Sequence, residues 1–213
     1  EQSEAYAQMK LLALARLESG ELSSTQNVLT QIMRLQQICL GHLTSDDGEV
    51  HELKSNRLDE LLDICEELQG KAIIWATWSR DIRTISEALC SRHNAKAAAR
   101  LHGETPDSER QQIVEDFQDP NSDLRFLVGH PRTGGYGLTL TAASTVIYYS
   151  NSYDLELRLQ SEDRAHRIGQ VNKVTYIDLI APHTVDQKIV KALREKLSVA
   201  DAILGEDSRS WLI

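Results

Sequence analysis

Apolar runs alternate with amphipathic helical patterns from Ser55 onward, and this alternation constrains the fold more than any other feature. The run at 72–78 (AIIWATW) carries no charge, which is typical of a strand buried on both faces of a parallel sheet. We expect further strands at 97–101, 125–129, 145–150 and 174–180, and helices at 55–69, 79–92, 106–117, 155–165 and 184–197. The order predicts an α/β fold, a doubly wound and mostly parallel sheet flanked by helices.

The first fifty residues follow a different pattern. Helical spacing of apolar residues covers 4–19 and then 23–39. The polar segment 42–54 has a turn signal at Asp47-Gly48, which indicates an exposed loop or a short hairpin. We therefore expect three parts: a helical extension over 1–54, an α/β lobe over 55–197, and a tail over 198–213.

Composition excludes several classes of protein. A net charge of −9 excludes an overall basic polyanion binder, and 5% aromatic residues argue against base-stacking platforms. Cys39, Cys65 and Cys90 form no C-x-x-C pair, so no disulfide framework or metal site is expected. No apolar run reaches the ~18–20 residues of a membrane span, and no signal peptide opens the chain. These features predict a cytoplasmic protein with no membrane partner.

The usual phosphate-binding loop, G-x-x-x-x-G-K-[ST], is missing from the chain. Its one Gly-Lys pair, Gly70-Lys71, lacks both the earlier glycine and the following hydroxyl. Asp59-Glu60 lies within an amphipathic helical pattern, which indicates a solvated face rather than a metal-binding box. The chain therefore lacks a triphosphate cradle and Mg²⁺ carboxylates of its own.

Two segments carry candidate chemistry. The glycine-rich segment 129–140 follows a strand, where Gly135 and Gly137 permit close approach of backbone to a phosphate or sugar, although a tight turn explains it equally. In 160–170 (QSEDRAHRIGQ), Arg164 and Arg167 lie three apart and are expected on one helical face, with Gln160 a turn earlier. Two such guanidiniums suit phosphate oxygens. The alternative is a salt-bridged surface formed by Arg158, Arg164 and Arg167 with Glu156, Glu162 and Asp163.

The order of these segments resembles the second RecA-like motor lobe of superfamily-two helicases, and closely that of Swi/Snf-type DNA-dependent ATPases. The resemblance rests on AIIWATWSR (72–80), LHGETPDSERQQIVEDF (101–117), FLVGHPRTGGYGLTLTAA (126–143) and LQSEDRAHRIGQ (159–170). The last segment contains the family's D-R-A-H-R-I-G-Q motif. The resemblance covers about residues 28–196 and implies ATP with Mg²⁺ as cofactor, both held mainly by a first lobe outside this chain.

The resemblance also implies roles for single residues. Arg164 and Arg167 correspond to arginine fingers, the catalytic residues of this lobe. Gln160, Asp163, Gly135 and Gly137 correspond to nucleotide-binding positions. Contacts with the backbone of duplex DNA fall to Thr77, Gly103, Thr105, Arg132 and Thr133.

Two segments depart from the family pattern. His130-Pro131-Arg132-Thr133 replaces the usual Ser-Thr-Arg-Ala, which moves the hydroxyl donors, and Asn151-Ser152-Tyr153-Asp154 replaces D-W-N-P. The short form is similar to compact phage or bacterial members, which implies a bacterial or phage-infected cell.

The function implied is the second lobe of an ATP-dependent DNA translocase or helicase, an ATP hydrolase that is inactive as this lobe alone and works with an N-terminal motor lobe. The alternative is a non-catalytic, helicase-like module that binds DNA or protein. A third reading, an unrelated small-molecule α/β enzyme, has no catalytic constellation in the sequence to support it.

Overall fold

The computed structural model describes residues 1–19, 25–45, 47–103, 105–133 and 138–197, together with 199, 203, 210 and 211. The chain forms two compact units. The sheet unit comprises Leu58–Leu179, and the helical unit combines Glu1–Arg57 with Ile180–Ile213.

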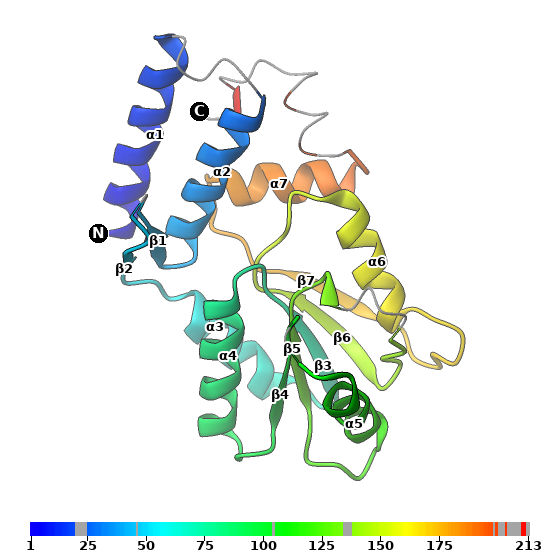
Figure 1. The fold of residues 1–213 in the computed structure, drawn as a ribbon. Coiled ribbons are helices and arrows are strands. Elements are labelled where there is room, and N and C mark those ends of the chain that lie inside the picture. The colour runs from blue at the N-terminus through cyan, green and yellow to red at the C-terminus, as the bar shows by residue number, and fades with distance from the viewer. Residues whose placement is uncertain are drawn as a thin grey trace. The chain divides into compact units, whose positions relative to one another are not determined.

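Five parallel strands form the sheet of the sheet unit, in the spatial order β4-β5-β3-β6-β7 (Figure 1). Their bounds are β3 (Lys71–Trp75), β4 (Ala98–Leu101), β5 (Phe126–Gly129), β6 (Ala143–Tyr148) and β7 (Thr175–Asp178). The uncharged run of the sequence is the central strand β3, and all its residues from Ala72 to Trp75 are fully buried. A central strand is covered on both faces, which explains why the run contains no charged residue.

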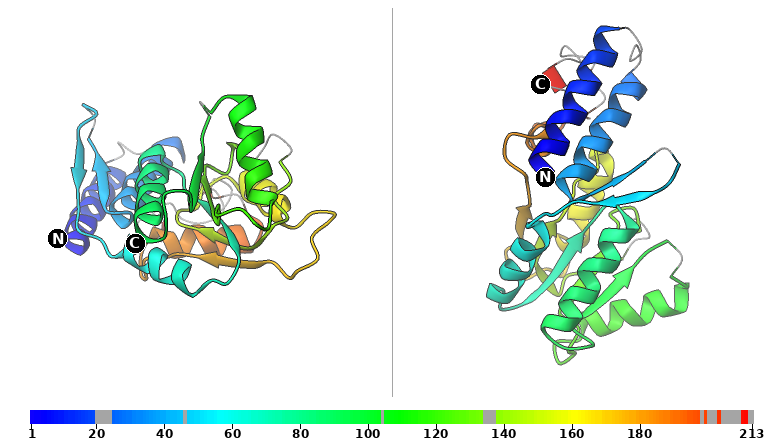
Figure 2. Two further views of the ribbon diagram at one scale, coloured as in Figure 1. Left: turned by 90° about the horizontal axis from the view of Figure 1, so that it is seen from below. Right: turned by 90° about the vertical axis from the view of Figure 1, so that its left-hand side faces the viewer.

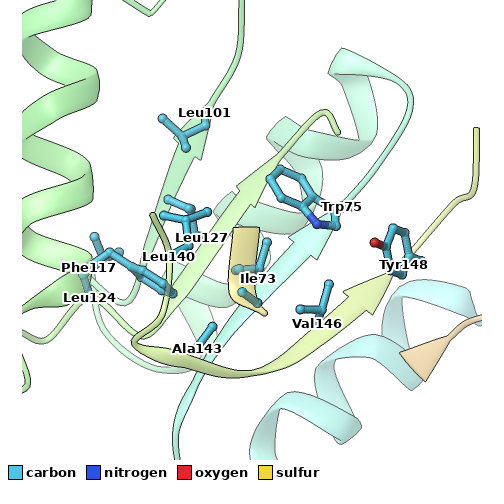
Figure 3. Packing of buried hydrophobic residues seen from close by; sticks show 11 residues of the cluster. Ile73, Trp75, Leu101, Phe117, Leu124, Leu127, Leu140, Ala143, Val146 and Tyr148 are labelled. Atoms are coloured by element: carbon cyan, nitrogen blue, oxygen red, sulfur yellow. The ribbon is translucent and has the colours of Figure 1, made fainter. Parts of the chain in front are cut away.

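Helices cover both faces of this sheet (Figure 1). The helices α3 (Arg57–Glu67) and α4 (Ser79–Arg92) lie on one side, and α5 (Asp107–Gln118) and α6 (Leu155–Ala165) on the other. Figure 3 shows the core on the side of α5 and α6, where Trp75, Phe117 and Tyr148 are its largest side chains. The predicted doubly wound α/β fold is therefore confirmed, with a sheet that is wholly parallel.

The strand β3 ends earlier than its apolar run. Ala76 N still donates to Gly129 O at 2.9 Å, but Thr77 N donates to the hydroxyl of Ser150 at 2.8 Å. A side chain thus replaces the next ladder partner, and the chain turns toward α4. The expected strand over 72–78 is correct in position but too long at its end.

The helical unit contains α1 (Gln2–Glu18), α2 (Thr25–Cys39), the hairpin of β1 (His42–Thr44) and β2 (Val50–Glu52), and α7 (Val185–Arg194). Figure 2 shows α1 and α2 side by side. One face of α7 is buried, through Ile189, Val190 and Leu193. The segment 42–54, expected as an exposed loop or a short hairpin, forms the antiparallel hairpin.

A buried ion pair joins the two chain segments of the helical unit. Arg57 Nη2 contacts Asp186 Oδ2, and the two side chains are 7% and 5% exposed. Asp186 Oδ2 also accepts a hydrogen bond from Ala181 N at 3.1 Å, and Tyr6 Oη accepts one from Val185 N at 2.9 Å. The start of α7 is therefore fixed by polar contacts as well as by apolar packing.

All three cysteines are free; Cys39 and Cys65 are buried and Cys90 is partly buried. Burial raises the pKa of Cys65 to about 12, so this thiol stays protonated. Asp59 and Glu60 are exposed on α3, as predicted. Among the described residues no helix is long and apolar enough to cross a membrane, and no group of three or more His, Cys, Asp or Glu is arranged to hold a metal ion.

Candidate functional site

A pocket of about 620 Å³ lies at the carboxyl end of α6. Its lining comes from one short stretch of chain, Gln160, Asp163, Arg164, His166, Arg167 and Ile168. The structure thus brings together the four residues of this stretch that the sequence singled out. Two guanidiniums and an amide at one pocket can bind an anion with several oxygens, such as a phosphate chain.

The helix α6 has a sharp amino-terminal start. Asp154 is its N-cap, and Asp154 Oδ1 accepts hydrogen bonds from Glu156 N at 2.9 Å and from Leu157 N at 3.2 Å. A carboxylate here satisfies two helix donors and complements the helix dipole. The helix then buries Arg158, Ser161 and Ala165 on one face.

The expectation that Arg164 and Arg167 share one helical face is wrong, because α6 ends at Ala165. The side-chain amide of Gln170 donates to Ala165 O at 3.2 Å, where a continuing helix would place a backbone N–H. The same amide donates to Thr141 O at 3.0 Å and to Ala143 O at 2.9 Å. Gln170 therefore ends the helix and ties its end to the start of β6.

The two arginines reach the pocket in different ways. Arg164 lies on the last turn of α6, and its Nε is buried with no hydrogen-bond partner within the part of the chain that the structure describes. Arg167 lies in the turn after the helix and donates from Nη1 to Thr139 Oγ1 at 3.2 Å. Leu140 N donates to Arg164 O at 3.0 Å, so the chain after the glycine-rich loop is bound to the arginine segment. Gly135 and Gly137 lie outside the described residues.

A polar cluster holds the buried face of α6. The Arg158 guanidinium contacts Glu162 Oε1 at 2.6 Å, Asn151 Oδ1 at 2.6 Å and Asp178 Oδ1 at 2.5 Å. Its Cζ lies 3.5 Å from the centroid of the Tyr148 ring. The predicted alternative of a salt-bridged surface thus holds for Arg158 with Glu162, but this arginine is buried rather than solvated.

The residues expected to contact DNA come from loops at the carboxyl ends of β3, β4 and β5. Thr77, after β3, is partly buried and shares a hydrogen bond of 3.2 Å with Ser150. Gly103 and Arg132 are exposed. Because the strands are parallel, these loops lie along the same edge of the sheet.

The hydroxyls of Thr105 and Thr133 are turned inward, in contrast to the expectation that they face DNA. Thr133 Oγ1 donates to His130 O at 2.7 Å and to Leu101 O at 3.2 Å. Thr105 Oγ1 accepts from His102 N at 3.3 Å. Both threonines are buried, so their hydroxyls shape the loops, as side chains commonly do in short turns.

Burial sets the protonation of two groups near these loops. It lowers the pKa of His130 below its usual range, and the charge of Arg132 acts in the same direction. His130 Nδ1 accepts from Arg132 N at 3.0 Å, which fits a neutral ring. Burial raises the pKa of the Tyr148 hydroxyl, so that this group stays protonated and shares a hydrogen bond of 2.7 Å with Ser161 Oγ.

The family described as "Helicase conserved C-terminal domain" matches residues 53–169 of the chain. The chain belongs to this helicase C-terminal domain family. The matched range contains β3 to β6 and the whole of α6, so it includes four of the five strands of the sheet and all the residues that line the pocket.

The curated relatives that the chain resembles include chromatin-remodelling ATPases. The chromatin-remodeling ATPase INO80 of Homo sapiens is 33% identical over 163 residues, which cover 76% of this chain and 10% of the relative. The human SWI/SNF-related matrix-associated actin-dependent regulator of chromatin subfamily A member 1 is 30% identical over 220 residues, 98% of this chain and 21% of the relative. The chain is thus similar to the C-terminal RecA-like lobe of SNF2-family ATPases, and it spans a small part of these relatives' length.

Solved structures agree with this fold. The Sulfolobus solfataricus SWI2/SNF2 ATPase C-terminal domain superposes with a TM-score of 0.69 at 22% identity, covering 100% of this chain and 89% of that one. The core of the Sulfolobus solfataricus SWI2/SNF2 ATPase, solved in complex with dsDNA, gives 0.70 at 24% identity, covering 99% and 44%. At these identities the likeness establishes the fold alone.

Sequence reasoning missed the residues that support the site. Gln170 is the last residue of the D-R-A-H-R-I-G-Q motif, and its side chain ends α6 through contacts that no local sequence pattern reveals. Asn151 and Asp178 lie at the ends of neighbouring strands and converge on Arg158. The one available signal was position, because polar residues directly after buried strands gather at the same sheet edge.

Proposed function

We propose that this chain is the second motor lobe of a Swi/Snf-type ATP-dependent translocase or helicase acting on duplex DNA, and that Arg164 and Arg167 serve as its arginine fingers. The observation that carries this proposal is the pocket formed by Gln160, Asp163, Arg164 and Arg167. The activity requires a first lobe that supplies the triphosphate cradle, so this lobe alone is inactive. Family membership supports the assignment of the partner lobe and of ATP.

The chemistry of the pocket fits the phosphates of ATP. Arg164 has a buried Nε donor with no partner in the described chain, which is a costly arrangement unless a ligand accepts from it. Arg167 donates to neutral oxygens, and charged phosphate oxygens are stronger acceptors. The side chains present fit a triphosphate, and carboxylates of the first lobe would hold the Mg²⁺ that accompanies ATP.

Closure of the two lobes would then control hydrolysis. The charges of Arg164 and Arg167 stabilise a transferring phosphoryl group only when the first lobe brings ATP against this pocket. An arginine finger contributes ~10³–10⁵ in rate in related phosphoryl-transfer proteins. Hydrolysis thereby depends on closure.

Contacts with DNA would come from the loops at the same sheet edge. Arg132 is an exposed cation, and the exposed Gly103 allows close approach of backbone to a phosphate. Thr77 follows the neighbouring strand β3, while Thr105 and Thr133 hold the loop shapes through their inward hydroxyls. Such contacts position a protein on DNA without reading its sequence.

The test is steady-state ATP hydrolysis by the complete parent protein, with and without duplex DNA. Arg164→Ala and Arg167→Ala are each expected to lower DNA-stimulated turnover by at least ~10³-fold while DNA affinity changes less than about threefold. Arg83→Ala is the matched control, because Arg83 is an exposed arginine on α4. Normal turnover in both finger variants, with a folded protein, contradicts the assignment.

The alternative is a non-catalytic module that binds DNA or protein, and it predicts a different result. The complete parent protein would then bind DNA without hydrolysing ATP, and the finger variants would bind equally well. Absence of hydrolysis in the unmodified parent protein favours that reading.

A further inference from the structure

Arg158 is a charged, largely buried side chain of the sheet unit that the finger mechanism does not use. Its side chain is 10% exposed, and it contacts Glu162, Asn151 and Asp178 by hydrogen bonds of 2.5–2.6 Å. The guanidinium also lies over the Tyr148 ring at 3.5 Å. The planar fork of arginine allows these contacts together, which the single ammonium of lysine does not.

The partners of Arg158 come from separate elements. Tyr148 is the last residue of β6, Asn151 follows it, and Asp178 is the last residue of β7. Asn151 Nδ2 donates to Asp178 Oδ1 at 3.0 Å, so the strand ends are also joined to each other. Through one side chain, α6 is attached to the carboxyl ends of two neighbouring strands.

Further hydrogen bonds fix the next turn of the helix. Tyr148 Oη and Ser161 Oγ lie 2.7 Å apart, and Ser161 Oγ donates to Arg158 O at 2.7 Å. Tyr176 Oη donates to Glu162 O at 3.2 Å. These contacts hold α6 against rotation directly before the turn that carries Asp163 and Arg164.

We propose that Arg158 is a positioning residue, which sets the rotation and height of α6 and thereby aims Arg164 into the pocket. This inference rests on the proposed function. Rotating a helix by about 20° moves a group ~6 Å from its axis by roughly 2 Å. A misplacement of about 1 Å can lower a rate ~10²-fold, so the orientation of α6 has direct consequences for hydrolysis.

A purely structural role of Arg158 leads to a different prediction. A buried ion pair that only stabilises the fold lowers the melting temperature when it is weakened, yet the folded molecules keep their turnover number. The Arg57–Asp186 pair provides the matched comparison, because both of its side chains are similarly buried and it lies in the helical unit.

The experiment uses the complete parent protein and measures DNA-stimulated ATP hydrolysis well below each variant's melting temperature. Arg158→Lys keeps the charge and loses the fork; kcat is expected to fall about 10- to 100-fold while KM for ATP changes less than about threefold. Arg57→Lys is expected to lower the melting temperature and to keep kcat within about twofold. An unchanged kcat in folded Arg158→Lys overturns the inference.

A double-mutant cycle identifies the route of the effect. If Arg158 acts by aiming Arg164, then adding Arg158→Lys to Arg164→Ala lowers kcat by less than about twofold further. If the losses of kcat in the two single variants multiply in the double variant, the inference is overturned, while the assignment of the arginine fingers stands. Normal hydrolysis in Arg164→Ala overturns the proposed function, and the inference with it.

Tyr148→Phe keeps the test decisive if Arg158→Lys does not fold. This change deletes the Tyr148 hydroxyl that is hydrogen-bonded to Ser161 Oγ and keeps the ring under the guanidinium. It is expected to lower kcat about three- to tenfold, with no further loss in the Arg164→Ala background. Unchanged turnover in Tyr148→Phe also overturns the inference.

Discussion

Replacing Gln170 tests whether one side chain ends α6. Its amide donates to Ala165 O, Thr141 O and Ala143 O at 2.9–3.2 Å. An amide has two hydrogens, so about two net donated hydrogen bonds are lost in Gln170→Ala, at roughly 1 kcal/mol each, together with the exposed one that Gln170 Oε1 accepts from Asn172 N. Because Gln170 is partly exposed, water replaces some of that loss. We expect the free energy of unfolding to fall by about 1–2 kcal/mol.

Gln170→Glu is the more discriminating substitution. An ionised carboxylate has no hydrogen to donate and faces three carbonyl oxygens, so this variant is expected to be less stable at pH 7 than Gln170→Ala. The same oxygens raise the pKa of the introduced carboxyl in the folded state above its unfolded value. Its stability therefore rises as pH falls toward the unfolded pKa, and is lost as pH rises through the folded one.

The measurement is urea unfolding of the chain at several pH values between 4 and 7. Gln112→Ala is the control, because Gln112 is exposed and makes one hydrogen bond with Asp116 on the same helix, worth about 0.5 kcal/mol or less. If both Gln170 variants are as stable as the parent chain, Gln170 does not determine where α6 ends. Equal pH dependence in Gln170→Glu and the parent chain contradicts the carbonyl contacts.

Two further predictions concern the loop after β5. Thr133→Val removes the hydroxyl whose one hydrogen is shared between Leu101 O and His130 O. The free energy of unfolding is expected to fall by about 1–2 kcal/mol, while DNA affinity stays within twofold. A large loss of affinity at unchanged stability would instead indicate an outward hydroxyl. The pKa of His130 is lower in the folded state than its unfolded value near 6.5. The free energy of unfolding is therefore fully retained at pH values above that unfolded pKa, and it falls as pH drops toward the folded pKa. Between pH 8 and pH 5, the melting temperature of His130→Asn is expected to decline less than that of the parent chain. An equal decline in both proteins contradicts the lowered pKa of His130.

The sequence was sufficient to predict the layers of the sheet unit. An uncharged run such as 72–78 is stable only between two covering layers, so β3 had to be central. The ends of elements depend on distant residues instead. β3 ends where Ser150 takes the Thr77 N–H, and α6 ends where Gln170 takes the Ala165 carbonyl. Neither partner is marked by hydrophobic periodicity.

The site was predictable to a similar degree. Arg164 and Arg167 line the same pocket, but they do not share the helical face that their spacing suggested, because one lies on the helix and the other in the turn beyond it. The inward hydroxyls of Thr105 and Thr133 were not predictable, because a threonine in a loop bonds its own backbone or an outside ligand with the same sequence signature.

The motif D-R-A-H-R-I-G-Q combines two kinds of residue, and the structure separates them. Five of its residues line the pocket: Asp163, Arg164, His166, Arg167 and Ile168. The other letters shape the chain: Ala165 is fully buried against the core, and Gly169 has φ +102°, which a residue with a side chain rarely adopts.

Gln170 also shapes the chain, as Ala165 and Gly169 do, because it holds the end of α6 to the chain before β6. The buried face of α6 is fixed by Arg158, about two turns before the helix ends at Ala165. The pocket residues therefore lie between two polar attachments, Arg158 at the strand ends and Gln170 at the start of β6. If either attachment is loosened, Arg164 and Arg167 should move relative to each other, which predicts that their two contributions to turnover are lost together rather than singly.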